Sequence, residues 1–160
     1  MTDSIHYYLA QINVGQLLAP QDDPRLVEFI DNLDRINSLA EQSPGFIWRL
    51  KDDSGNAMSF QVFDNPQVIS NISVWKDIES LRTFVYDTQH LEFVKRRKEW
   101  FELMKRPQVA LWWVPANHRP TLKEGAHKLE ILETRGPSPE AFTFAQNYPI
   151  PEESPMCYPR

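Results

Sequence analysis

Four segments of the chain have the residue pattern of β-strands, in which alternate side chains face opposite sides of a sheet. They are residues 5–14, 45–52, 69–76 and 108–115, and each is rich in β-branched or aromatic residues. Gly15 is expected to end the first strand. The pattern therefore predicts a sheet of four strands.

Between the strands, apolar residues recur at the spacing of amphipathic helices. One helix is predicted over residues 26–40, preceded by Asp-Pro and followed by Pro-Gly. Helical spacing also runs over residues 78–85 and 88–104, and the pattern leaves open whether the helix breaks or bends between them. A last helix is predicted over 121–136, with a threonine cap at its start and a glycine at its end.

The elements follow one another as strand, helix, two strands, long helix and strand, with an appended helix. This βαββαβ order is that of the ferredoxin-like α+β fold, an antiparallel sheet with its helices on one face. Residues 141–144 are expected to add a short edge strand. The other face of the sheet would be bare in a single chain, so we expect a homodimer in which two sheets face each other.

Two adjacent tryptophans, Trp112 and Trp113, lie in the fourth predicted strand. Alternation places their rings on opposite faces, so one is predicted beneath the helices and the other on the uncovered face. The alternation alone does not decide which ring lies on which face.

Composition excludes several classes of partner. The 160-residue chain is long enough for one domain with a substantial core. Its net charge of −5 argues against a nucleic-acid partner or an anionic membrane, and the basic run at 95–98 is interpreted as a solvated helix face. Cys157 is the single cysteine, so no intramolecular disulfide and no cysteine metal cluster are expected. Without a transmembrane span or a signal peptide in the sequence, a cytoplasmic location is expected.

Polar residues occupy alternate positions of the first three predicted strands. A sheet face used only for dimer packing would be more uniformly apolar, so these residues predict a ligand cavity on the uncovered face. The alternatives are exposure at the ends of the sheet and hydrogen bonds between subunits. The residues expected there are Gln11, Asn13, Arg49, Asn71, Ser73 and Trp75.

Two histidines are further candidates. His90 and Arg97 share one stripe of the predicted long helix and would place a proton acceptor beside a fixed cation. The structural alternative is a His90 bonded to the backbone and an Arg97 paired with a nearby carboxylate. His118 follows the fourth strand, where a strand end can deliver a side chain to a cavity mouth; the alternative is a histidine held in a turn. Pairs of histidine and carboxylate are too few for a dinuclear metal site, and no metal is predicted.

Two blocks of the sequence resemble a known protein family. They are "SVW…L..FVY…H…R..WF" and "LWWVP..H.PT", within a resemblance that covers about residues 7–144. By them the chain is identified as a member of domain-of-unknown-function family 3291, which is placed among the dimeric α+β barrel proteins. That superfamily includes cofactor-free oxygenases of aromatic polyketides, haem-binding proteins and metabolite sensors, and the fold does not choose among them.

The leading functional hypothesis is a small-molecule-binding protein of the oxygenase-like kind, acting on an apolar or aromatic compound without a bound organic cofactor. In it His90 is the base, Arg97 and Asn71 hold developing negative charge, and Trp75 stacks on the substrate with one strand-four tryptophan. The alternatives are a haem protein with His90 or His118 as iron ligand, and a non-catalytic ligand sensor or interaction module. Residues 1–144 are predicted to form the single domain, followed by a proline-rich tail at 145–160.

Overall fold

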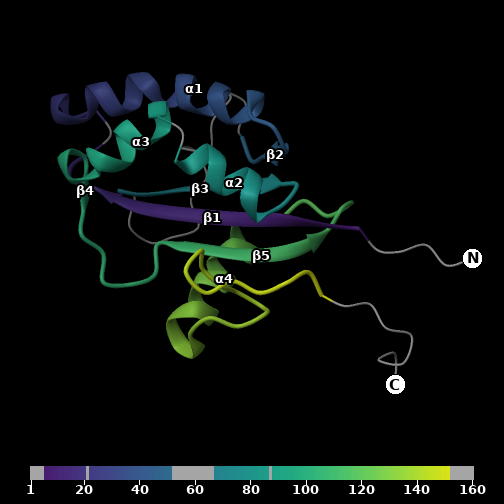
Figure 1. Ribbon diagram of the computed structural model, residues 1–160. Coiled ribbons are helices and arrows are strands. Elements are labelled where there is room, and N and C mark those ends of the chain that lie inside the picture. Colours follow the sequence, from purple (N-terminus) through teal and green to yellow (C-terminus); the bar gives the residue numbers. More distant parts are fainter. Residues whose placement is uncertain (1–5, 21, 52–66, 87, 152–160) are drawn as a thin grey trace, which may run out of the picture.

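An antiparallel sheet runs through the centre of the molecule (Figure 1). The computed structural model describes residues 6–20, 22–51, 67–86 and 88–151, and of residues 88–90 and 93 it describes the backbone only. Across the sheet the order is β2-β3-β1, with β5 and the short β4 both pairing with the free side of β1. The strands are β1 (Tyr7–Leu17), β2 (Phe46–Arg49), β3 (Val68–Trp75), β4 (Phe101–Glu102) and β5 (Val109–Pro115).

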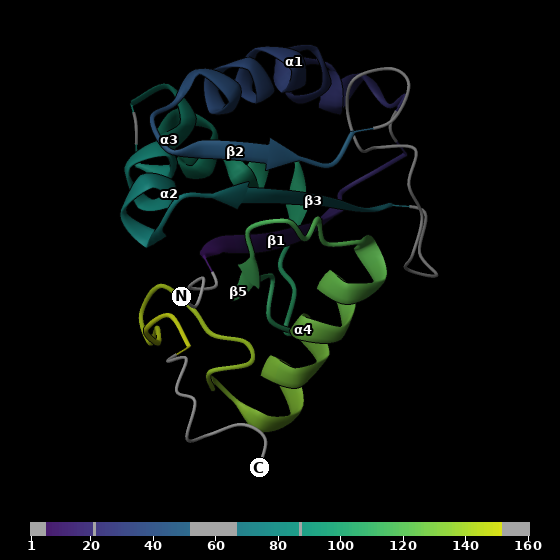
Figure 2. The ribbon, with the colours of Figure 1, turned by 90° about the vertical axis from the view of Figure 1, so that its right-hand side faces the viewer.

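Helices cover both faces of the sheet, as Figures 1 and 2 show. One face carries α1 (Val27–Gln42), α2 (Ile78–Val85) and α3 (Thr88–Lys95), with a 3-10 turn, η1 (Pro24–Leu26), before α1; the other carries α4 (Leu122–Arg135). This order of elements confirms the predicted ferredoxin-like α+β fold with an appended helix. No helix within the described residues is both long enough and apolar enough to cross a bilayer.

The first strand extends further than predicted. β1 continues through Gly15 to Leu17, so the expected stop at Gly15 is wrong. A Cβ atom at Gly15 would lie 2.6 Å from the ring of Phe101, which belongs to β4. The glycine therefore serves a close approach between two strands rather than a turn.

The predicted helix over 88–104 is wrong in its second half. α3 ends at Lys95, and a 3-10 turn, η2 (Arg97–Glu99), leads into β4. Trp100 is 2% exposed and packs with Leu17 and Leu26. The helix thus ends shortly before this indole ring is buried against residues distant in sequence, and residue spacing alone does not distinguish such a cluster from the apolar stripe of a helix. α2 and α3 are separate helices, and Asp87 between them lies outside the described residues.

The second face of the sheet is not bare, which corrects the sequence-based expectation. α4 packs on it through Leu122, Leu129 and Leu132, and the central sheet residues of this cluster are fully buried within one chain: Ala10, Ile12, Ile72, Val74 and Ala110. The helix lies close to the sheet at Gly125, where a Cβ atom would lie 2.7 Å from Ile12 Cδ1. The sheet face on which the prediction of a homodimer rested is thus covered by α4 of the same chain. A homodimer stays a prediction and would have to use another surface.

The two adjacent tryptophans lie on opposite faces, as alternation predicts. Trp112 is on the α4 face, where its Nε1 donates to Glu124 Oε2 at 2.9 Å. Trp113 is on the face of α1–α3, and its Nε1 donates to the backbone oxygen of Tyr148 at 2.9 Å. Each indole N–H is satisfied within the chain, so neither ring needs a partner molecule to bury its polar atom.

The segment after α4 packs against the sheet edge. The edge strand expected at 141–144 is reduced to a single antiparallel bridge between Phe142 and Leu111. The Tyr148 hydroxyl donates to the oxygen of Pro137 at 3.2 Å, and its ring lies 5.9 Å from that of Phe142. The described part of the tail up to Tyr148 is therefore attached to the core, although residues 145–160 were expected to follow the domain as a separate tail. Residues 152–160 lie outside the described part of the chain.

Candidate functional site

The predicted polar residues of the sheet do lie side by side, but beneath α1–α3 rather than on an uncovered face. Leu9 and Trp75 pack with residues of α1 and α2, and alternation along β1 and β3 places the polar residues on that same side. In the strand register, Gln11 pairs with Ser73, Ser73 with Arg49, and Asn13 with Asn71. We call the five residues Gln11, Asn13, Arg49, Asn71 and Ser73 the polar band.

A hydrogen-bond network joins four members of the polar band. Gln11 Nε2 donates to Asn71 Oδ1 at 2.8 Å and to Ser73 Oγ at 2.7 Å. Asn13 Nδ2 donates to Gln11 Oε1 at 3.1 Å. The indole N–H of Trp75 also donates to Ser73 Oγ, at 2.8 Å. Gln11 is thus bonded to three other side chains and lies at the centre of the network.

The polar band lies between two apolar clusters. On one side are Leu9, Trp75 and Phe84, and on the other Leu17, Leu26 and Trp100. Burial falls along the polar band: Gln11 is 5% exposed and Ser73 6%, whereas Asn71 is half-buried and Asn13 exposed. The band is therefore closed at Ser73 and open to solvent at Asn13.

Trp75 does not offer a free ring face. Its ring stacks on Phe84 at 5.3 Å and meets Phe46 edge-on at 5.4 Å, and the residue is 1% exposed. The expectation that this ring stacks on a substrate is therefore wrong, because core aromatic rings already occupy its surroundings. Its contribution to the polar band is the single indole N–H.

Arg49 forms an ion pair with Glu41. Its Nε lies 2.8 Å from Glu41 Oε2, and the arginine side chain is 8% exposed. Glu41 belongs to α1 and Arg49 to β2, so the pair joins the helix to the edge of the sheet. This position supports a structural role more directly than the predicted contact with substrate.

The predicted His90–Arg97 stripe does not form, because Arg97 lies beyond the end of α3. Arg97 is exposed, and its Nη2 donates to Gln108 Oε1 at 2.8 Å. Gln108 precedes Val109, which pairs with Asn13, so Arg97 lies near the open end of the polar band. His90 is a residue of α3, and its side chain lies outside the described part of the structure.

His118 lies on the opposite side of the sheet from the polar band. Its Nε2 is 2.6 Å from Glu124 Oε1, and Glu124 also accepts the indole N–H of Trp112. The carboxylate holds the imidazole in the loop before α4, which agrees with a histidine held in a turn. The described residues contain no group of three or more histidine, cysteine, aspartate or glutamate side chains arranged to hold a metal.

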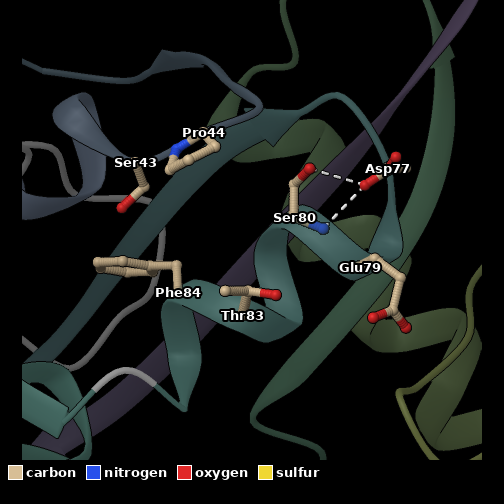
Figure 3. Close-up of a pocket in the computed structure, with 7 residues that line it drawn as sticks. All are labelled: Ser43, Pro44, Asp77, Glu79, Ser80, Thr83 and Phe84. Carbon is tan, nitrogen blue, oxygen red and sulfur yellow. Dashed lines mark hydrogen bonds between the residues drawn. The ribbon is translucent and has the colours of Figure 1, made fainter.

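A surface hollow of about 270 Å³ lies between the end of α1 and the start of α2 (Figure 3). Phe84 forms part of its lining, and the same ring stacks on Trp75. Sequence reasoning did not single out this hollow; the one signal was the Asp77-x-x-Ser80 spacing of a helix N-cap. The lining residues are Ser43, Pro44, Asp77, Glu79, Ser80, Thr83 and Phe84.

Asp77 caps α2 at this hollow, and its replacement by alanine is expected to lower the free energy of unfolding by about 1 kcal/mol at pH 7. Its carboxylate accepts hydrogen bonds from the Ser80 hydroxyl at 2.7 Å and from the Ser80 N–H at 2.8 Å. Both bonds lower the pKa of Asp77 below its ordinary value of 3.8. The contribution of the carboxylate is therefore present above that value and is lost as the pH falls through the lower pKa of the folded state.

Urea unfolding at pH 7 and pH 3 checks this prediction. The difference between the wild type and Asp77→Ala should narrow at pH 3. Asp34→Ala, at an exposed position of α1, is the control and should show no comparable loss. A difference that stays constant with pH would contradict the capping role.

Comparison with family models shows to which protein family the chain belongs. A family model described as "Domain of unknown function (DUF3291)" matches residues 8–157. The chain belongs to the DUF3291 family. The match continues beyond residue 144, where the sequence resemblance was expected to end, and includes the segment that carries Tyr148. No curated protein sequence matches the chain.

Solved structures with a similar chain path come from several organisms. A variant of SnoaB, a cofactor-independent oxygenase from Streptomyces nogalater, is 13% identical with a TM-score of 0.46, and the match covers 70% of this chain and 95% of SnoaB. A conserved protein from Methanosarcina mazei Go1 is 15% identical with a TM-score of 0.48, covering 69% and 93% of the two chains. A protein from Pseudomonas aeruginosa is 12% identical with a TM-score of 0.47, covering 72% and 100%. Identities at this level transfer no activity between proteins.

Proposed function

We propose that this DUF3291 protein binds a small, largely apolar or aromatic molecule that carries a carbonyl or enolate oxygen, and that it does so at the open end of the polar band. The observation that carries the proposal is the buried network centred on Gln11, placed between two apolar clusters. Polar atoms in such a place can bind and orient a ligand, and the two clusters make the surroundings of the polar band largely apolar.

The energetic cost of the network supports this role. Strand pairing uses backbone groups only, so the fold does not require amide side chains at these positions. Burying an amide or hydroxyl group costs free energy unless a hydrogen bond compensates it, and an apolar face would avoid that cost. Packing alone therefore does not require the polar band.

Two residues of the network, Ser73 and Asn71, also have donor protons that the network does not use. Ser73 Oγ accepts two hydrogen bonds, and its own proton meets no acceptor within the described residues. The amide group of Asn71 accepts through Oδ1, while its Nδ2 protons have no partner among the described residues. Asn71 is the less buried of the two residues, so its amide protons lie toward the open end of the band, where they match an acceptor oxygen and would stabilise the negative charge of an enolate.

For catalysis we propose oxygenation without an organic cofactor. On an enolisable aromatic ketone such as anthrone, a base removes a proton from the CH₂ carbon, and O₂ adds to that carbon to give a hydroperoxide. Loss of water then leaves a carbonyl group, so one oxygen atom is retained and the other leaves as water. His90 of α3 is the proposed base, and Asn71 is proposed to hold the enolate oxygen.

Binding is tested with 9-fluorenone, a stable tricyclic ketone. We expect saturable binding to the wild type in calorimetric titrations, and a loss of about tenfold or more in affinity for Asn71→Ala, because a donor to the carbonyl is removed. Gln67→Ala, at a polar residue away from the polar band, is the control and should bind as the wild type does. The site would be rejected if 9-fluorenone did not bind to the wild type. It would also be rejected if Asn71→Ala and Gln67→Ala bound 9-fluorenone with equal affinity.

Catalysis is tested separately with anthrone, by oxygen uptake above the rate without protein. Exchanging His90 for glutamine keeps a hydrogen-bonding group but removes the proton acceptor near neutral pH. We expect 9-fluorenone binding to be retained and oxygen uptake to be lost. Binding without any oxygen uptake by the wild type would reject the proposed oxygenation of anthrone and leave a binding role.

A further inference from the structure

Gln11 has a position in the network that differs from that of the other polar residues. It is 5% exposed, and both of its amide protons are engaged, one by Asn71 and one by Ser73. Its oxygen accepts from Asn13. Although sequence reasoning placed Gln11 among the substrate-binding residues, its bonds are already made inside the network.

We propose that Gln11 is a positioning residue that fixes the polarity of the site: it turns the oxygen of Asn71 inward and thereby presents the amide N–H groups of Asn71 to the ligand. The proposal rests on the function proposed above, since it concerns how the same site selects its ligand. It assigns to the site a preference for ligands that accept hydrogen bonds over ligands of the same shape that donate them.

The physical basis is the twofold ambiguity of a carboxamide. The terminal torsion of asparagine has a broad, roughly twofold energy profile, so the oxygen and nitrogen exchange places at little intrinsic cost. Gln11 Nε2 can only donate, and at 2.8 Å from Asn71 it requires the oxygen of that amide. The same donor at 2.7 Å from Ser73 requires the serine oxygen, which already accepts from Trp75. The serine proton must therefore point elsewhere.

The hydroxyl of Ser73, like the amide of Asn71, therefore turns its oxygen toward Gln11 and keeps its proton for another acceptor. The indole N–H of Trp75 is a donor only, so two fixed donors converge on one hydroxyl oxygen. With Gln11 in place, the groups left for a ligand are predominantly donors. Without it, Ser73 keeps only the Trp75 N–H and Asn71 only a long contact of 3.5 Å with Asn13 Nδ2, so both side chains can reverse more easily and most of the preference for an acceptor should be lost.

The test uses two tricyclic probes of matched shape. 9-Fluorenone carries a carbonyl acceptor, and carbazole carries an N–H donor in the corresponding position. We expect the wild type to bind 9-fluorenone about tenfold more tightly than carbazole, which is the difference made by one well-formed hydrogen bond. Calorimetric titration gives the ratio of the two affinities, and a general loss of stability does not change this ratio.

Two substitutions at Gln11 have different expected outcomes. Gln11→Met keeps the length of the side chain and removes its hydrogen bonds, so the ratio should fall to about one. Gln11→Glu replaces the donor by acceptors, which turns the Asn71 nitrogen inward, and the ratio should reverse in favour of carbazole. Gln16→Met, on the same strand but bonded to Glu102 outside the polar band, is the control and should keep the wild-type ratio. A wild-type ratio in both Gln11 variants overturns the proposal.

A ligand-free measurement separates this proposal from the proposed function. In ¹⁵N NMR spectra of the wild type, the side-chain amide protons of Gln11 should exchange with water about tenfold more slowly than those of exposed glutamines, because both are hydrogen-bonded. Fast exchange of these protons overturns the positioning role even if 9-fluorenone binds. Slow exchange together with no binding of either probe supports the network and rejects the proposed function. The measurement also holds if a Gln11 variant does not fold.

Discussion

Replacing Gly125 with leucine is expected to lower the free energy of unfolding by about 3 kcal/mol or more. The reason is the close contact between α4 and the sheet, where even a Cβ atom would lie 2.7 Å from Ile12 Cδ1 and 3.1 Å from Ile72 Cδ1. Both isoleucines are fully buried, so the larger side chain cannot be accommodated without moving the helix. Urea unfolding followed by circular dichroism measures the effect.

Lys123→Leu is the matched control, because it adds the same side chain to the same helix at an exposed position. Its expected change in stability is within about 0.5 kcal/mol. If Gly125→Leu were as stable as this control, α4 would not be held against the sheet in solution. The second face of the sheet would then be free for a partner, as the sequence pattern by itself had predicted.

Replacing Trp75 with alanine is expected to lower the free energy of unfolding by about 4 kcal/mol. Trp75 is 1% exposed and lies between the rings of Phe46 and Phe84, so its loss leaves a large cavity beneath α2. Its N–H also donates to Ser73, so the hydrogen bonding of the polar band is disturbed as well. Thermal and urea unfolding measure the first effect, and binding of 9-fluorenone measures the second.

Trp75→Phe separates packing from hydrogen bonding. Phenylalanine retains most of the aromatic contact but has no N–H, so we expect a smaller loss of about 1 to 2 kcal/mol. If this variant and Trp75→Ala were equally unstable, the hydrogen bond to Ser73 would dominate over packing. That result would contradict the assignment of Trp75 to the core.

The position of the polar band shows which part of the site was predictable. Alternation along β1 and β3 predicts that Gln11, Asn13, Asn71 and Ser73 share one face, and the strand register confirms it. Alternation shows only which residues share a face, however, and does not tell which of the two faces the helices cover. The expectation of an uncovered face was wrong because α4 packs on the side that alternation left unassigned.

His90 and Arg97 illustrate a different limit. Their spacing of seven residues predicts one stripe only while the helix continues. Trp100 is buried against Leu17 and Leu26, which are distant in sequence, and this long-range contact accompanies the end of the helix at Lys95. Arg97 therefore lies outside α3, at the surface beside Gln108.

The sequence by itself determined the type and order of β1, β2, β3, β5 and the helices, because hydrophobic period and turn residues act within a few positions of one another. It also determined that Trp112 and Trp113 lie on opposite faces and that the polar residues share one. It did not predict η2 or β4, which stand where a longer helix was expected. Only the tertiary structure decided that α4 covers the second face, that Trp75 is enclosed by aromatic rings and that Gln11 joins three polar side chains. These are contacts between residues far apart in the chain, and their energies depend on the packing of the whole domain rather than on any local pattern.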